Sequence, residues 1–224
     1  DPARADAGAV PDFGLNAAPD WRAVFGYLRI DSDYRLILDN FLDLTHVGYV
    51  HVGTIGNAPV SDAPIELVSE EGLVRFNRTM KAIPPSPTFV KLMGSRELVD
   101  RRTTSTWLPP GHFLNEVHAA PAGQPDPAAA IRFHVNNSLT PETETTTHYF
   151  WAVTRNFQLQ DDAVGALLAS ENAAAFLEDK VVIEEQQRMM DIEVPATPIM
   201  PIAADRGVLA MRRLLEKLER GEAR

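Results

Sequence analysis

The pattern of apolar and polar positions divides the chain into a strand-rich middle and helical ends. In the middle, β-branched and aromatic residues alternate in part with polar ones, and Pro, Gly and Asn separate the segments. This pattern predicts an antiparallel meander. The predicted strand segments are Glu66 to Met80, Glu97 to Trp107, Phe113 to Ala119, Ala130 to Ser138 and Thr145 to Thr154.

Apolar residues recur with helical spacing on both sides of this region. The predicted helices are Tyr34 to Tyr49, Asp161 to Ala169, Ser170 to Met190 and Asp205 to Glu219. Strands grouped centrally with helices at the ends predict an α+β fold, in which a curved antiparallel sheet wraps around long helices. We expect one domain over residues 21–224 and an irregular connector over residues 1–20, which are rich in Ala, Pro, Asp and Gly.

Composition narrows the function classes. The 224 residues include 21 Lys and Arg against 31 Asp and Glu, a net charge of −10, which disfavours nucleic acid as a partner. Apolar runs are far shorter than the roughly 20 residues that a membrane-spanning helix needs. The N-terminal segment has no features of a secretory signal, so we expect a cytoplasmic protein that does not bind membranes. The absence of Cys excludes disulfides and thiolate-held iron–sulfur clusters from this chain.

The first segment with candidate chemistry runs from Asp39 to His51. Most of this predicted helix is apolar, and its polar residues include Asp39, Asn40, Asp43 and His46. A stripe of this kind often faces only water. Gly48 and Gly53 would let the chain turn, however, so that the imidazoles of His46 and His51 could reach one point. Two histidines beside a carboxylate form a candidate metal site.

The second segment lies in the predicted long helix. Asp179 shares a face with the apolar residues Phe176 and Ile183, whereas Glu178, Glu184 and Glu185 fall on other faces and are expected in solvent. A carboxylate on an apolar stripe must be paired, protonated or bound to a cation. A buried salt bridge from Asp179 to an Arg would satisfy that need. Two His and one Asp would instead form the facial triad that suits non-haem Fe(II) and dioxygen chemistry.

These motifs carry a family resemblance that covers nearly the whole chain. The run D-N-x-x-D-x-x-H-x-x-x-x-H, from Asp39 to His51, followed by T-I-G-N, resembles the mononuclear-iron motif of Rieske non-haem iron oxygenases. Later motifs resemble the branch of vanillate O-demethylase and dicamba monooxygenase. They are Thr140 to Thr145, His148 to Trp151, Glu178-Asp179, Val182 to Glu184 and Gln186-Gln187.

The resemblance implies specific roles. His46, His51 and Asp179 match the three ligands of the mononuclear Fe(II), and Asn40 matches a polar residue near the iron. Asp43 matches the acid that links an iron-ligating His to a cluster-ligating His of the adjacent subunit. Asn115 and Asn137 are candidates for holding the carboxylate of an aromatic acid, although each is equally typical of a turn or strand edge. The remaining histidines are expected to be ordinary surface or core residues: His112, His118, His134 and His148.

The resemblance also implies partners that this chain does not contain. A Rieske [2Fe-2S] cluster needs two Cys, so we expect it in an upstream domain that is absent from this chain. With that domain we expect a homotrimer, which receives electrons from NAD(P)H through a separate reductase. The implied reaction is O-demethylation of a methoxylated aromatic acid such as vanillate by O₂, with release of formaldehyde. Ring dihydroxylation, N-demethylation and a metal-free carrier of hydrophobic ligands are the alternatives.

Overall fold

Seven antiparallel strands form the main layer of the computed structural model, which describes residues 8, 10–70, 72–124, 130–192 and 200–221. The strand order is β1-β7-β6-β5-β4-β3-β2, so the last six strands form a meander and the first closes against the last. This arrangement confirms the predicted antiparallel sheet. The strands are β1 (Arg22–Ile30), β2 (Glu66–Glu70), β3 (Leu73–Ile83), β4 (Val99–Leu108), β5 (His112–Pro121), β6 (Ile131–Thr143) and β7 (Thr146–Arg155).

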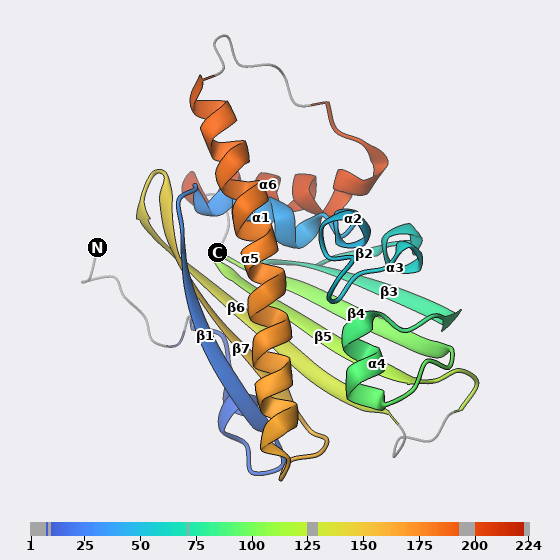
Figure 1. Cartoon of the computed structure of the whole chain (residues 1–224). Helices are drawn as coiled ribbons and strands as arrows, with labels where there is room; N and C mark the ends of the chain where they lie inside the picture. The colour runs from blue at the N-terminus through green and yellow to red at the C-terminus, as the bar shows by residue number, and fades with distance from the viewer. Residues whose placement is uncertain (1–7, 9, 71, 125–129, 193–199, 222–224) are drawn as a thin grey trace.

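Helices cover one face and one end of this sheet. Figure 1 shows α5 running across the curved sheet, with α1 and α6 gathered near one end of it and α4 near the other. The α+β architecture predicted from the sequence is therefore confirmed. The helices are α1 (Tyr34–Leu42), α2 (Val47–Val50), α3 (Ala58–Asp62), α4 (Pro87–Met93), α5 (Asp162–Ile192) and α6 (Arg206–Glu219), with short 3-10 turns η3 (Gly14–Ala17) and η5 (Ala203–Asp205).

The hydrophobic core lies between the helices and the inner face of the sheet. Leu38 of α1, Trp107 of β4 and Leu168 of α5 are completely buried there. Phe41 of α1 stacks on Phe113 of β5 with ring centroids 5.0 Å apart. Because such interiors are densely packed, these side chains hold α1 and α5 at fixed positions over the sheet.

The predicted helix from Tyr34 to Tyr49 is interrupted. Helix α1 ends at Leu42, and Asp43 adopts an extended conformation with its carboxylate accepting hydrogen bonds from Thr45 N at 2.9 Å and Thr45 Oγ1 at 2.5 Å. An aspartate that binds the backbone two residues ahead competes with helical hydrogen bonding. The chain therefore turns at residues 43–46 before the single turn of α2, which contains Gly48. It turns again over residues 52–55, where Gly53 lies, as the sequence suggested.

The structure also corrects the predicted bounds of one pair of helices and of one strand. The two helices predicted over residues 161–190 are one, α5. Ser170, where the second was expected to begin, lies inside it and donates to the carbonyl of Leu167 at 3.0 Å. The strand predicted from Glu66 to Met80 is a hairpin, β2 and β3, which turns beside Gly72 with a φ of +81°. Strand β1 and helices α3 and α4 were not predicted from the sequence.

The predicted connector is described only in part, because residues 1–7 and 9 lie outside the described residues. Asn16 in η3 accepts hydrogen bonds from Thr154 Oγ1 at 2.5 Å and from Asn136 Nδ2 at 3.0 Å. This part of the segment is therefore packed against strands β6 and β7. The strand predicted from Phe113 to Ala119 is slightly longer in the structure, because β5 runs from His112 to Pro121.

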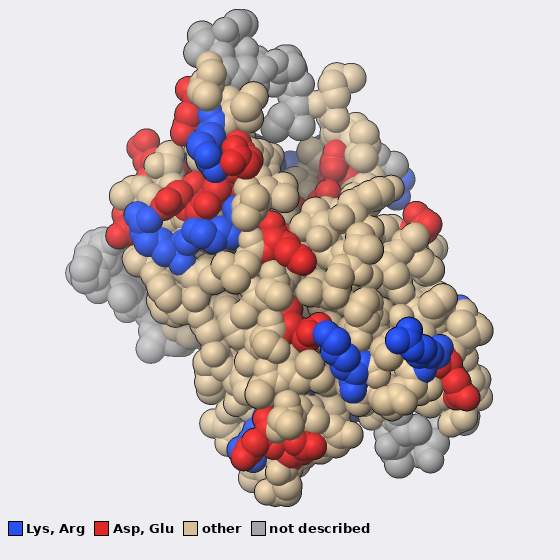
Figure 2. Space-filling view, viewed as in Figure 1, with Lys and Arg blue, Asp and Glu red and all other residues tan. Residues whose placement is uncertain are grey.

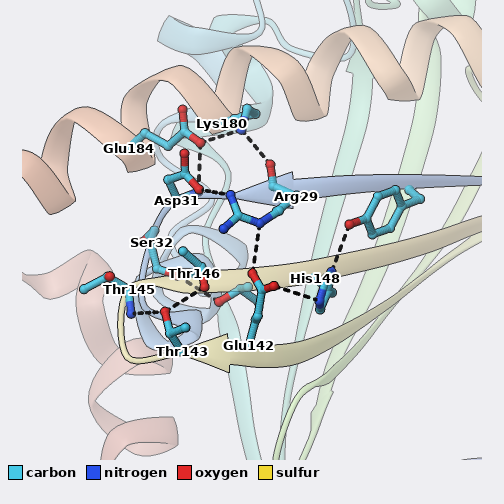
Figure 3. Close-up of polar contacts among 12 residues, drawn as sticks. Arg29, Asp31, Ser32, Glu142, Thr143, Thr145, Thr146, His148, Lys180 and Glu184 are labelled. Carbon is cyan, nitrogen blue, oxygen red and sulfur yellow. Dashed lines mark hydrogen bonds and ion pairs between the residues drawn. The ribbon is translucent and has the colours of Figure 1, made fainter.

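Polar contacts fasten α5 to strand β1 (Figure 3). Lys180 Nζ donates to the carbonyl of Arg29 at 2.6 Å, and Glu184 accepts from the backbone N–H of Asp31 at 2.8 Å. Lys180 and Glu184 also form an ion pair with each other at 2.5 Å. Glu184 was expected in solvent, but it faces the end of β1. These bonds lie next to Asp179 in the helix, so they help to fix the position of that residue.

Basic and acidic side chains are neighbours on the surface. On the face shown in Figure 2, Lys and Arg side chains lie beside acidic ones. The pairs Arg22–Asp162 and Lys91–Glu171, each at 2.6 Å, are examples of such neighbours. Among the helices in the described part of the chain, none has both the length and the apolar character required to cross a bilayer.

Candidate metal centre

Three side chains from two helical segments converge on one point. His46 precedes α2, His51 follows it, and Asp179 lies in the middle of α5. The two Nε2 atoms are 3.3 Å apart, and Asp179 Oδ1 lies 3.0 Å from His51 Nε2 and 3.5 Å from His46 Nε2. All three ligand atoms lie within 4.8 Å of one another, so one ion could contact all of them.

The loop between the two histidines depends on a glycine. Gly56 N donates to the carbonyl of His51 at 3.0 Å, and a Cβ at Gly56 would lie only 1.9 Å from the carbonyl oxygen of Val47. No side chain larger than hydrogen fits there without a shift of the backbone. Asn57 then caps α3 by accepting from Val60 N at 3.3 Å and also donates to the carbonyl of Pro84 at 2.8 Å. The T-I-G-N motif thus holds the loop that presents His51.

Two neighbouring carboxylates of α5 contact the two nitrogens of His51. Asp179 Oδ1 faces Nε2, while Glu178 Oε2 lies 2.8 Å from Nδ1 and also accepts from Thr54 Oγ1 at 3.2 Å. The expectation that Glu178 faces solvent was therefore wrong, because the His51 loop packs over that side of the helix. With Nδ1–H donating to Glu178, the Nε2 lone pair of His51 is directed at the common point.

His46 is oriented by the backbone. Its Nδ1 donates to the main-chain carbonyl of Asp43, which leaves Nε2 to face His51 and Asp179. Burial lowers the pKa of His46, which favours the neutral, ligating form of the ring. Burial also opposes a charge on His51, but the hydrogen bonds and charges of Asp179 and Glu178 outweigh it and raise the pKa of that ring.

The other two residues of the motif lie beside this cluster. Asn40 Nδ2 donates to Asp179 Oδ1 at 3.2 Å, so Asn40 positions the carboxylate. The carboxylate of Asp43 is occupied by Thr45, and its contact with His46 runs through the main chain. The salt bridge from Asp179 to an Arg, considered as an alternative, is absent among the described residues. The ionisable side chains that contact Asp179 Oδ1 are the two histidines.

The donor set fits a divalent transition metal. Two imidazole nitrogens and one carboxylate oxygen on one side are the ligands expected for non-haem Fe(II) with open positions opposite. The three side chains are buried or half-buried, with side-chain exposures of 17% for His46, 2% for His51 and 11% for Asp179. Without a cation, the two Nε2 atoms and the buried carboxylate would face one another with little water to solvate them, which is unfavourable.

An apolar pocket that encloses about 100 Å³ adjoins the cluster. Asn40, His46, His51 and Asp179 line it from the helical side, and the inner face of the sheet lines it from the other. Five aromatic side chains complete much of its wall: Phe41, Phe89, Phe113, Phe133 and Phe176. This combination of a few polar groups with aromatic walls is typical of a site for a small aromatic molecule.

Both predicted substrate-binding asparagines line this pocket, but their amides differ in availability. Asn137 accepts from Tyr149 Oη at 2.6 Å and donates to the carbonyl of Phe113 at 3.2 Å. Asn115 accepts from Ser105 Oγ at 3.1 Å. Within the described structure, the amide nitrogen of Asn115 has no hydrogen-bond acceptor. Asn115 is thus better placed than Asn137 to donate to a ligand.

The remaining histidines lie outside this cluster. His112 contacts Ser138 Oγ at 3.0 Å, and His134 packs edge-on against Trp21 with ring centroids 5.0 Å apart. His148 lies 2.9 Å from Tyr27 Oη on the outer side of β7 (Figure 3). In the described part of the chain, the candidate metal cluster consists of His46, His51 and Asp179.

Residues 30–221 match the family model for the vanillate O-demethylase oxygenase C-terminal domain. The chain belongs to this family. It is a catalytic domain of the Rieske non-haem iron oxygenase type, in the branch of vanillate O-demethylase and dicamba monooxygenase. Its resemblance to the iron motif of that group is therefore confirmed.

Individual relatives agree with this assignment. The toluene-4-sulfonate monooxygenase iron–sulfur subunit of Comamonas testosteroni is 33% identical over 99% of this chain and 66% of its own length. A crystal structure of dicamba monooxygenase with 3,6-dichlorosalicylic acid has a TM-score of 0.91 at 34% identity, over 99% of this chain and 66% of that one. Another, with non-haem iron and dicamba, has a TM-score of 0.76 at 32% identity, over 99% and 64%. The chain thus spans slightly less than two thirds of these proteins.

Proposed function

We propose that this chain is the catalytic domain of an oxygenase that O-demethylates a methoxylated aromatic acid such as vanillate. The observation that carries the proposal is the convergence of His46, His51 and Asp179 at the edge of an aromatic pocket. The family to which the chain belongs supports the reaction, because it is described by a vanillate O-demethylase oxygenase. The non-haem iron in a crystal structure of the related dicamba monooxygenase supports the choice of iron as the metal.

In this proposal, His46 Nε2, His51 Nε2 and Asp179 Oδ1 hold a mononuclear Fe(II). When bound there, Fe(II) supplies the activation of dioxygen. The methoxy carbon of the substrate is hydroxylated, and the resulting hemiacetal loses formaldehyde to leave a phenol. For each turnover, one O₂ and two electrons from NAD(P)H are consumed, and the second oxygen atom leaves as water.

The chain's own residues orient the reactants. Glu178 and the Asp43 carbonyl hold the two imidazoles with Nε2 facing the common point, and Asn40 holds the Asp179 carboxylate. The aromatic walls bind the ring of the substrate and exclude water from it. A substrate bound in this way would have its methoxy group near the three metal ligands. No residue of the protein would need to form a covalent bond with it.

We further propose that electrons arrive from a Rieske [2Fe-2S] domain of a neighbouring copy in a homotrimer, supplied by a separate NAD(P)H-dependent reductase. The absence of Cys from this chain requires the cluster to lie elsewhere. Asp43 and His46 line a second cavity at the outer side of α1, together with Val182 and Met190 of α5. Met190 and the nearby Val182 are about half exposed, as expected for a surface that a partner covers.

The function is tested by supplying the complete protein with vanillate, NADH and a reductase, and by measuring formaldehyde and the demethylated phenol. We expect equal amounts of both products. A cis-dihydrodiol would instead identify ring dihydroxylation, and activity confined to N-methyl substrates would identify N-demethylation. Binding of aromatic ligands with no metal and no turnover would favour the hydrophobic-ligand carrier.

A further inference from the structure

Two buried arginines line the pocket from the sheet side. Arg78 of β3 is 1% exposed and Arg101 of β4 is 8% exposed, and both side chains contribute to the pocket wall. In the register of these strands, Arg78 pairs with Thr103 and Arg101 pairs with Met80. The two arginines are therefore diagonal neighbours on the inner face of the sheet, within reach of each other. Neither was singled out by the sequence motifs.

Arg78 is held in place by main-chain groups. Its Nη2 donates to the carbonyls of Ser61 at 2.9 Å and Ala63 at 3.1 Å, and its Nε donates to Ala63 at 3.3 Å. These bonds attach it to the end of α3. Its Nη1 is buried and has no partner among the described residues. One nitrogen of this guanidinium, with its two N–H groups, is thus left over after the structural contacts are made.

Arg101 has fewer contacts. Its guanidinium carbon lies 4.6 Å from the centroid of the Phe89 ring, a cation–π contact. Its Nε is buried without an acceptor, and the Arg101 side chain has neither a hydrogen bond nor an ion pair with the other described residues. A guanidinium carries five N–H donors in a planar fork, so a nearly complete set of donors is unused inside the protein.

The electrostatics match this geometry. Burial, together with the positive charge of Arg78, lowers the pKa of Arg101 to about 10. Burial also lowers the pKa of Arg78 to about 10. Both groups remain protonated at neutral pH. Two cations that repel each other inside a low-dielectric site are stabilised strongly by an anion placed between or beside them.

The position of these cations relative to the metal cluster suggests what the anion belongs to. The metal ligands come from the two residues that flank α2 and from α5 in the helical layer, whereas Arg78 and Arg101 lie on the sheet that forms the opposite wall. Phenylalanine rings line the space between the two walls. A ligand that fills this pocket would therefore have a flat apolar body, a reactive group at the helical wall and a negative charge at the sheet wall.

We propose that Arg101, assisted by Nη1 of Arg78, binds the carboxylate or sulfonate group of an aromatic acid substrate. The proposal deepens the proposed function and rests on it for the identity of the reacting group. It makes Arg101 the principal anchor of the acid, a role for which the sequence suggested Asn115 and Asn137. The Asn137 amide is already engaged by Tyr149 and Phe113. Asn115 remains available as a neutral third donor.

The test compares charged and neutral ligands on the 224-residue chain. Dissociation constants are measured by calorimetry for vanillate, for 4-methoxybenzenesulfonate and for the uncharged vanillyl alcohol. The variants are Arg101→Gln, Arg101→Lys and, as a matched control, Arg102→Gln. Arg102 is the next residue of β4 and is exposed on the outer face of the sheet. Thermal melting and Fe(II) titration of each variant show whether the fold and metal site are intact.

We expect Arg101→Gln to weaken binding of the preferred anion about 10- to 100-fold, the range of one or two lost charge-assisted hydrogen bonds. Binding of vanillyl alcohol should change less than about threefold, and Arg101→Lys should restore part of the loss. The wild-type preference between the two anions identifies a carboxylate or a sulfonate as the favoured group.

The proposal would be overturned if Arg101→Gln weakened the binding of vanillyl alcohol as much as that of the anions. It would also be overturned if the wild-type protein bound vanillyl alcohol as tightly as it binds both anions. These outcomes differ from failure of the proposed function. Absence of Fe(II) binding or of formaldehyde release would refute the oxygenase reaction, while charge-dependent binding through Arg101 would still stand.

Discussion

Glu178 should strengthen metal binding although it does not touch the metal. The replacement Glu178→Ala removes the carboxylate oxygen that accepts from His51 Nδ1 at 2.8 Å and from Thr54 Oγ1 at 3.2 Å. The His51 side chain is only 2% exposed, so its Nδ1–H would lose its acceptor inside the protein. The ring could then rotate or change tautomer, and Nε2 would no longer be held toward His46 and Asp179.

The magnitude follows from these contacts. Leaving a buried donor unsatisfied costs about 1–3 kcal/mol, and the loss of a partner that orients a metal-ligating His costs about 10- to 100-fold in metal affinity. The Glu178 side chain is 35% exposed, so water screens part of its charge. We therefore expect an effect near the lower end, about tenfold, and a smaller one for Glu178→Gln, which keeps an acceptor oxygen.

The assay is anaerobic titration of the purified chain with Fe(II), with the same measurement for Glu185→Ala as the matched control. Glu185 lies on the same helix, but its carboxylate pairs with Arg188 at 2.5 Å on the exposed side. The control should bind Fe(II) like the wild type. If Glu178→Ala binds Fe(II) within twofold of the wild type while remaining folded, the contact with His51 has no positioning role and this reasoning is refuted.

Three further predictions address the fold and the electron route. Gly56→Ala should destabilise the protein by about 1–3 kcal/mol in urea unfolding, because its Cβ would collide with the Val47 carbonyl; an unchanged midpoint would contradict the loop geometry. Leu168→Ala should cost about 2–5 kcal/mol and lower the melting temperature, because Leu168 is completely buried in α5; a loss below about 1 kcal/mol would show that the core collapses around the cavity. In the complete protein, Asp43→Asn should leave most of the iron in place, since Asp43 holds His46 through its main chain, but should reduce NADH-coupled demethylation more than 100-fold. Near-normal turnover would make Asp43 an ordinary surface acid, and loss of iron would make its carboxylate part of the metal site.

The parts of the fold that could be predicted depend on local patterns. Strands β4 to β7 alternate in polarity and are separated by turn residues, so the sequence alone indicates them. Strand β1 was missed because Phe25 and Tyr27 lie on its outer face, 67% and 49% exposed, and conceal the alternation. The break at Asp43 depends on a hydrogen bond from its side chain to the backbone, which helical periodicity does not reveal.

The same distinction applies to the site. The motif around His46 and His51 and the apolar face that carries Asp179 are visible in the sequence. The role of Glu178 is not, because it depends on how the loop after α2 packs against α5. Arg101 and Arg102 are adjacent and chemically identical, and only the strand register shows that Arg101 faces the pocket.

The central claim, that His46, His51 and Asp179 hold one Fe(II), is tested most directly by metal stoichiometry. The chain is loaded with Fe(II) under anaerobic conditions, passed through a desalting column and analysed by elemental mass spectrometry, together with His46→Ala, His51→Ala and Asp179→Ala. We expect about one iron per chain in the wild type. Each variant should retain little iron, because the loss of one of three ligands costs several kcal/mol. Full iron occupancy in folded preparations of these variants would contradict the account.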